Sequence, residues 1–147
     1  MTESEALQLI SQPKSARNWT GFKLRDNHAG HLIGSAILVD RQEITIPGVT
    51  MEIEIKAPIV TTRCLLLFTL RYRDGKRRPR AYQLEVVPSD KRSHNGEVPL
   101  YGPHEHILEL DAVSIQSPEV HCDNWDGCFE WFLNRVNVSN FEVARPC

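Results

Sequence analysis

Residues 64–87 read CLLLFTLRYRDGKRRPRAYQLEVV, and this stretch decides the fold. Its first part is apolar at every position through Phe68, and from Leu70 onward apolar side chains alternate with charged ones. Asp74-Gly75 begins a loop of about five residues, after which the segment 80–87 alternates again. Two such runs joined by a short loop predict an antiparallel hairpin whose first strand is central in a sheet where it starts and exposed where it ends.

Further segments on both sides of this hairpin alternate with the same period of two, which is typical of strands with one wet face. These segments are 19–24, 32–39, 44–46, 49–55 and 107–115. We expect Pro47-Gly48 to turn the chain between two of them, and Phe141 and Val143 to form a last strand. The composition of residues 88–102 predicts a long irregular loop, a kind of segment that is usually functional or disordered.

Two helices complete the pattern. Thr2 and Glu5 have the spacing of a capping box and open a short apolar stretch that Pro13 ends. Between Trp125 and Val136 apolar side chains recur every three or four residues, with Asp123 or Asn124 available as the cap. We therefore expect one α+β domain over residues 1–147: a mainly antiparallel sheet of about six to seven strands, a short N-terminal helix and a C-terminal amphipathic helix.

Composition and charge are those of an ordinary globular chain, with 41% hydrophobic and 24% charged residues. A net charge of −2 gives no general preference for nucleic acid or for an anionic membrane. Residues 1–11 lack the basic start of a signal peptide, and the apolar run 64–70 is too short to cross a bilayer, so we expect a cytoplasmic location and no membrane partner. The four cysteines are then expected to stay reduced.

The predicted hairpin and the residues after it are strongly basic. Eight of the seventeen lysines and arginines lie between positions 71 and 92: Arg71, Arg73, Lys76, Arg77, Arg78, Arg80, Lys91 and Arg92. Only Asp74, Glu85 and Asp90 oppose them in this stretch. Guanidinium groups bind phosphate through two parallel donors, so these residues are candidates for contacting nucleic acid. A solvated loop or a contact with an acidic protein fits the same pattern.

Histidines follow the basic stretch. Pro103-His104-Glu105-His106 leads into a predicted strand, where His104 and His106 would project to the same face. With His94 from the preceding loop, they are candidates for general acid–base catalysis, because imidazole titrates near neutrality. A metal site would need a third ligand, for which His94 and Glu109 are the nearest candidates; we expect no metal and no cofactor. Two histidines with no chemical role are a further alternative.

The segments Tyr82-Gln83-Leu84-Glu85, His94-Asn95-Gly96 and Pro103-His104-Glu105-His106-Ile107 together resemble the central pattern of small bacterial proteins related to the TumE toxins. The resemblance spans residues 82–107 and implies a toxin of a toxin–antitoxin pair that acts on RNA and has a DNA-binding antitoxin as its partner. His94, His104 and His106 fall on positions of that pattern. Gln83 departs from it, since the group tends to have a basic or apolar residue there.

The sequence thus leaves three functions open. The first is a toxin-like protein acting on RNA, as a metal-independent endoribonuclease whose histidines supply acid–base chemistry. The second is a binding protein without enzymatic activity, such as a phage or mobile-element inhibitor, that holds nucleic acid or an acidic protein through the basic hairpin. The third is a metal-binding enzyme that uses His104 and His106. Whether the chain is an enzyme is not decided by the sequence.

Overall fold

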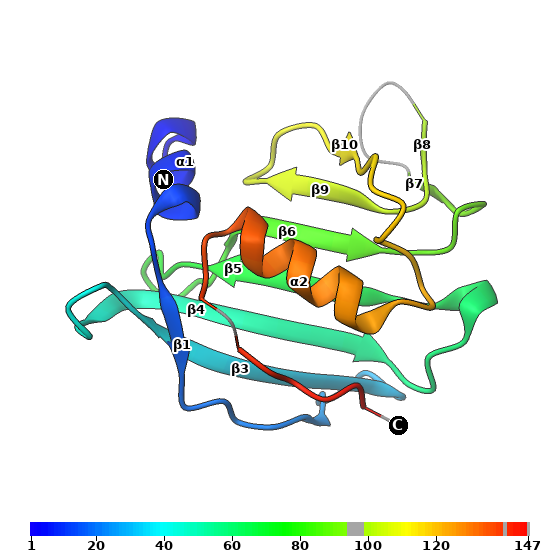
Figure 1. Cartoon of the computed structure of the whole chain (residues 1–147), viewed down its shortest axis with the longest axis horizontal. Helices are drawn as coiled ribbons and strands as arrows, with labels where there is room; N and C mark the ends of the chain where they lie inside the picture. Colours follow the sequence, from blue (N-terminus) through cyan, green and yellow to red (C-terminus); the bar gives the residue numbers. More distant parts are fainter. Residues whose placement is uncertain (94–98, 140, 147) are drawn as a thin grey trace.

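The computed structural model describes residues 1–93, 99–139 and 141–146. Eight strands form one antiparallel sheet in the order β1-β3-β4-β5-β6-β9-β10, with β2 also pairing with β3 (Figure 1). The elements of this sheet and the two helices are α1 Glu3–Ser11, β1 Ser15–Arg17, β2 Lys23–Leu24, β3 His31–Val39, β4 Thr45–Lys56, β5 Leu66–Arg71, β6 Arg80–Val86, β9 His104–Ile107, β10 Val113–Ser114 and α2 Trp125–Arg135. The predicted α+β class is confirmed.

Two further short elements lie in the connections. A 3₁₀ turn, η1 Thr61–Arg63, joins β4 to β5, and the strands β7 Arg92–Ser93 and β8 Leu100–Tyr101 pair with each other inside the predicted irregular loop. The predicted strand 19–24 is wrong in its bounds: the sheet instead contains the short strands β1 and β2, which both pair with β3. In the described residues, no helix is both long and apolar enough to cross a membrane.

The hairpin that the sequence predicted is the centre of the sheet. β5 and β6 pair antiparallel, with Phe68 opposite Leu84, and the register shifts between Leu70 and Arg71. On one face, Phe68 packs against the rings of Trp125, Phe129 and Phe132 of α2 at centroid distances of 5.5 to 6.0 Å. The apolar stripe that the sequence predicted for α2 is thus the side of the helix that covers this face of the sheet (Figure 1).

The predicted turn at Pro47-Gly48 is wrong, because β4 continues through it. Ile37 of β3 pairs with Thr50 of β4, and Val39 pairs with Thr45. The four residues 46–49 of β4 therefore lie opposite one residue of β3, position 38, which makes this part of β4 a bulge. Gly48 has a φ of 72°, which a bulge accommodates and which side chains other than glycine rarely adopt. The chain turns earlier instead, where the backbone N–H of Asp40 donates to the carbonyl of Ile44.

The predicted strand 107–115 is also misplaced. The strand β9 starts at His104 and ends at Ile107, and the next residue, Leu108, has a φ of 51° and leads into a turn before β10. Apolar side chains continue to alternate beyond Ile107, so the sequence pattern alone did not show this end. Phe141 and Val143 lie outside any strand, although the carbonyl of Val143 accepts a hydrogen bond from Trp125 Nε1 at 2.9 Å.

The expectation of reduced cysteines is wrong for one pair. Cys64, directly after η1, and Cys122, in the segment before α2, form a disulfide with their Cα atoms 5.9 Å apart. The two residues are separated by 58 positions, so nothing in their local spacing announced the contact. Cys128 is a free thiol in the core. The cytoplasmic location stays a prediction, and disulfides are more common in oxidising compartments.

We predict that the disulfide contributes substantially to stability. Closing a loop of this length should destabilise the unfolded chain by about 4 kcal/mol, so the Cys64→Ser/Cys122→Ser variant should lose roughly 2 to 4 kcal/mol of unfolding free energy. Urea titrations of the oxidised protein and of this variant measure the difference, and peptide mapping without reductant identifies the linked cysteines. Free alkylation of both cysteines in the native protein, or equal stability of the two forms, would contradict the assignment.

Candidate functional site

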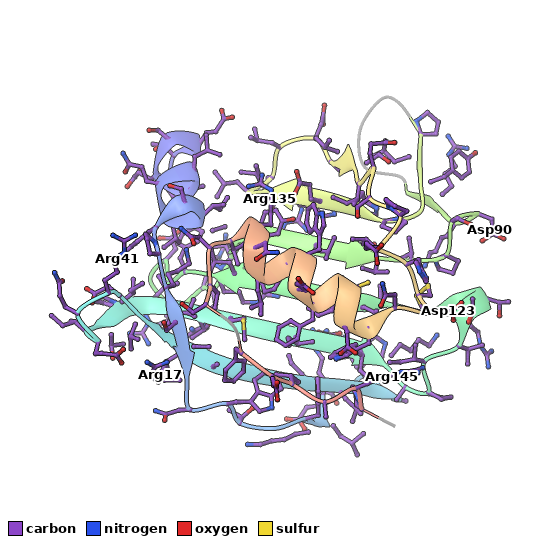
Figure 2. All side chains as sticks on the ribbon, in the orientation of Figure 1. Arg17, Arg41, Asp90, Asp123, Arg135 and Arg145 are labelled. Carbon is purple, nitrogen blue, oxygen red and sulfur yellow. A yellow bond between two sulfur atoms is a disulfide. The ribbon has the colours of Figure 1, made fainter. Side chains whose placement is uncertain are left out.

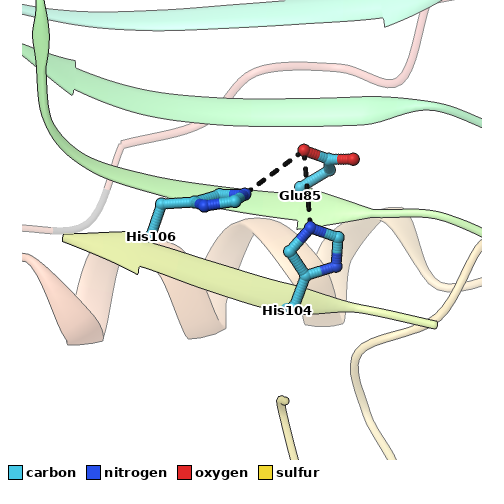
Figure 3. A group of neighbouring side chains, drawn as sticks. All are labelled: Glu85, His104 and His106. Carbon is cyan, nitrogen blue, oxygen red and sulfur yellow. Dashed lines mark ion pairs between the residues drawn. The ribbon is translucent and has the colours of Figure 1, made fainter. Parts of the chain in front are cut away.

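The candidate site lies on the sheet face turned away from α2. Residues paired across an antiparallel sheet point to the same side, and Glu85 is paired with His104 while Gln83 is paired with His106. Their neighbours Tyr82 and Leu84 point the other way, into the core beneath α2. Figure 3 shows Glu85, His104 and His106 together on the face opposite the helix.

These three side chains converge on one oxygen atom. Glu85 Oε1 lies 3.5 Å from His104 Nε2 and 3.4 Å from His106 Nε2 (Figure 3). The potential ligand atoms of the three residues all lie within 4.8 Å of one another. Both histidines are buried, with 1% of each residue exposed, whereas 26% of the Glu85 side chain is accessible. Any opening of the cluster to solvent is therefore beside the carboxylate.

The protonation of His104 follows from its second nitrogen. His104 Nδ1 lies 3.0 Å from the carbonyl oxygen of Gly102, which can only accept a hydrogen bond, so Nδ1 carries a proton. In the neutral ring, Nε2 then presents a lone pair toward Glu85. Within the described part of the chain, the Nε2 atoms of His104 and His106 are buried without a hydrogen-bond partner. A neutral His104 whose Nε2 lone pair faces a carboxylate in this way requires a proton or a cation between the two atoms.

The pKa shifts agree with this geometry. Burial by itself would raise the pKa of Glu85, but its interactions with His104 and His106 outweigh burial and hold that pKa well below its ordinary value. Burial by itself would lower the pKa of His104, but the Glu85 carboxylate and the Gly102 carbonyl raise it above its ordinary value. The cluster therefore favours an ionised Glu85 with positive charge beside it.

Glu105, between the two histidines, fixes the strand that carries them. Its side chain points to the α2 face, where Glu105 Oε2 accepts hydrogen bonds from Tyr82 Oη at 2.7 Å and from Arg135 Nε at 3.1 Å. Arg135 also lies over the Tyr82 ring, at the end of α2 near β9 (Figure 2). These contacts tie β9 to β6 and to α2, and a shift of the short strand that moved the histidines away from Glu85 and Gln83 would break them.

The structure brings together two of the three predicted catalytic residues. His104 and His106 share a face as expected, and His94 lies outside the described residues. Glu109, expected as a possible third ligand, is exposed and lies 3.6 Å from Arg80 instead. Sequence reasoning missed Glu85 as the partner, although its alternation in β6 already placed it on the face opposite Tyr82. The sequence did not show that β6 and β9 are neighbours, which is what places Glu85 opposite His104.

The sequence suggested that the eight basic residues contact nucleic acid together, but in the structure they do not form one surface. Arg71 and Arg80 are opposite each other in β5 and β6, but Arg71 forms an ion pair with Glu52, and Arg80 donates to Gln83 and to the carbonyl of Leu108. The exposed cations near the hairpin loop are Arg73, Lys76, Arg77 and Arg78. Two of the predicted basic contacts are therefore engaged within the protein.

Lys91 and Arg92 are exposed at the other end of β6, which at about 3.3 Å per residue is roughly 20 Å from the hairpin loop. Asp90, which directly precedes them, is seen at this end in Figure 2. A strand carries its two ends to opposite edges of the molecule, so closeness in the sequence did not mean closeness in space.

No family model, no curated protein and no solved structure matches the chain. The likeness to TumE-related toxins therefore has no support from these comparisons and stays a prediction.

We predict that the metal-free protein loses stability as the pH rises. The pKa of His104 is raised on folding, so its contribution is fully present below about pH 6.5, where the unfolded histidine titrates, and is lost as the pH passes the folded pKa. Urea titrations in EDTA between pH 6 and 8.5 measure this. Glu85→Gln removes the carboxylate that raises the pKa and should flatten the decline.

Other groups also titrate in this pH range, including Lys14, because burial lowers its pKa to about 8. Their contributions to the pH dependence are the same in the parent and in Glu85→Gln, so they cancel in the comparison. Glu109→Gln, which removes an exposed carboxylate, should keep the slope of the parent. An identical slope in the parent and in Glu85→Gln would show that Glu85 does not control the protonation of His104.

Proposed function

We propose that this protein binds a divalent transition-metal ion through Glu85, His104 and His106. The observation that carries the proposal is the pair of buried Nε2 atoms, which point at one carboxylate oxygen and lack a hydrogen-bond partner in the described residues. A bound cation would accept the lone pair of His104 Nε2 and that of a neutral His106 protonated at Nδ1, and it would neutralise the carboxylate at the same time. This replaces the expectation that the site holds no metal.

The spacing of the ligands supports a small ion with tetrahedral geometry. For metal–ligand bonds of about 2.1 Å, the corners of a tetrahedron are about 3.4 Å apart. The two distances from Glu85 Oε1 to the imidazole nitrogens, 3.4 and 3.5 Å, match this spacing. The outer limit of 4.8 Å for the whole group is wider than a tetrahedral edge, so the most distant pair of ligand atoms would move closer together around an ion. Two imidazoles and a carboxylate suit Zn²⁺ and similar ions, whereas Mg²⁺ prefers oxygen ligands.

The surroundings are also those of a metal ligand. A ligating histidine usually donates its other ring N–H to a carbonyl or carboxylate, which fixes the ring and its tautomer. His104 has this arrangement through Gly102. Gly102 has a φ of 75°, and a Cβ placed there would come within 3.2 Å of the Ser89 backbone. The glycine therefore allows the close turn that directs its carbonyl at His104 Nδ1.

Burial favours metal binding over acid–base catalysis by these histidines. An acid or base must come within hydrogen-bond reach of its substrate, and rings that are 1% exposed do not offer that access to an RNA backbone. Toxin-like action on RNA stays a separate prediction. The ion would instead join β9, a strand of four residues, to the central strand β6.

We predict one bound Zn²⁺ per chain. Isothermal titration of tag-free, EDTA-stripped protein with ZnCl₂ should give a stoichiometry near one, and MgCl₂ should give no heat above dilution. Glu85→Gln keeps the shape of the side chain but removes its charge, and it should weaken zinc binding by at least about tenfold, or about 1.4 kcal/mol. His104→Ala and His106→Ala should abolish stoichiometric binding.

Two variants serve as controls. Glu109→Gln and His28→Ala each remove one exposed side chain of the same type and should bind zinc like the parent. Circular dichroism confirms that each variant is folded. Absence of zinc binding by the parent, or equal affinity in Glu85→Gln and Glu109→Gln, would refute the proposal.

A further inference from the structure

We propose a second site on the same sheet face: a hollow between Lys23 and Arg78 that binds the phosphate group of a nucleotide, either free or within an RNA strand. The hollow has a volume of about 360 Å³, and Lys23, Arg78, Thr20, Ser35, Thr50 and Glu52 are among the residues that line it. The inference does not depend on the metal, because it rests on other residues.

Arg78 is exposed, but hydrogen bonds to two neighbouring residues fix its position. Arg78 Nη2 donates to Thr50 Oγ1 at 3.0 Å, and the carbonyl of Arg78 accepts from Arg71 Nη1 at 2.9 Å. Both the backbone and the guanidinium of this residue are therefore positioned by neighbours. A guanidinium fixed in this way loses little conformational entropy when it binds an anion.

The charge of the hollow is positive although the chain as a whole carries −2. Lys23, on the short strand β2, is exposed and forms no ion pair with any described residue. Glu52 is the acidic residue among those that line the hollow, and its ion pair with Arg71 compensates its charge. Two cations from opposite sides thus remain for an anion.

Size and polar groups favour a nucleotide as the ligand. The volume falls in the range of pockets for small molecules, which begins at about 300 Å³. The hydroxyls of Ser35 and Thr50 can contact a sugar or a base, while Lys23 and Arg78 contact the phosphate. The Thr20 hydroxyl already donates to the Gly21 carbonyl and accepts from the Ser35 N–H. The exposed Lys76 and Arg77 directly precede Arg78, so a longer strand leaving the hollow would meet further positive charge.

The hollow and the proposed metal centre are distinct. Glu52 is connected to His106 by the paired residues Thr69 and Gln83, which means three strand spacings of about 4.8 Å, or roughly 14 Å. Loss of one site should therefore leave the other unchanged. A failure of zinc binding would not affect this inference.

The test uses two probes: adenosine monophosphate, and a fluorescently labelled single-stranded RNA of ten nucleotides without a terminal phosphate. Binding is measured by calorimetry and by fluorescence anisotropy over a series of salt concentrations. We expect Lys23→Ala/Arg78→Ala to weaken binding of at least one probe by tenfold or more and to reduce its salt dependence. Arg78→Lys keeps the charge without the two-pronged donor and should fall between parent and double variant.

The matched control is Lys91→Ala/Arg92→Ala, which removes the same charge at the far end of β6 and should change affinity less than twofold. If both probes bind and adenosine monophosphate displaces the RNA, a free nucleotide is a sufficient ligand. If only the RNA binds, the ligand is an RNA strand. No binding of either probe by the folded parent, or equal losses in the two double variants, would overturn the proposal.

Discussion

The pairing of β6 with β9 is the constraint on which the candidate site depends. It places Glu85 opposite His104, and it holds because Glu105, on the other side of the same strand, is bound by Tyr82 and Arg135. A shift of one residue would turn the histidines toward the aromatic core and Glu105 toward the opposite face of the sheet, at a cost in buried, unpaired polar groups. The contacts of Glu105 on one face of the sheet thus stabilise the arrangement of Glu85, His104 and His106 on the other face.

Local patterns were enough to predict the hairpin β5–β6, the helix α2 and the capping box of α1, because these features depend on residues close in sequence. The shared face of His104 and His106 also follows from strand geometry alone. Their partner Glu85 does not, since it required knowing which strand lies beside β9. The burial of both imidazole rings was also not predictable, because the polar residues of a Pro-His-Glu-His segment do not indicate whether other parts of the chain cover them.

Two other errors have the same origin. The basic residues looked like one surface because they are adjacent in sequence, but β6 carries Lys91 and Arg92 to the far end from Arg78. The disulfide between Cys64 and Cys122 was missed because 58 positions separate them and the fold alone brings them together. Contacts between distant segments are set by the whole sheet, and a single sequence without its fold does not reveal them.

The central claim is that Glu85, His104 and His106 bind one metal ion, and X-ray absorption spectroscopy of the zinc-loaded, tag-free protein tests it most directly. The account predicts a first shell of nitrogen and oxygen at about 2.0 to 2.1 Å, with the outer-shell scattering of two imidazole rings. In Glu85→Gln the same two imidazoles should remain while the shell changes. A sulfur ligand at about 2.3 Å, which would point to Cys128 or another thiol, or a shell without imidazole, would contradict the claim.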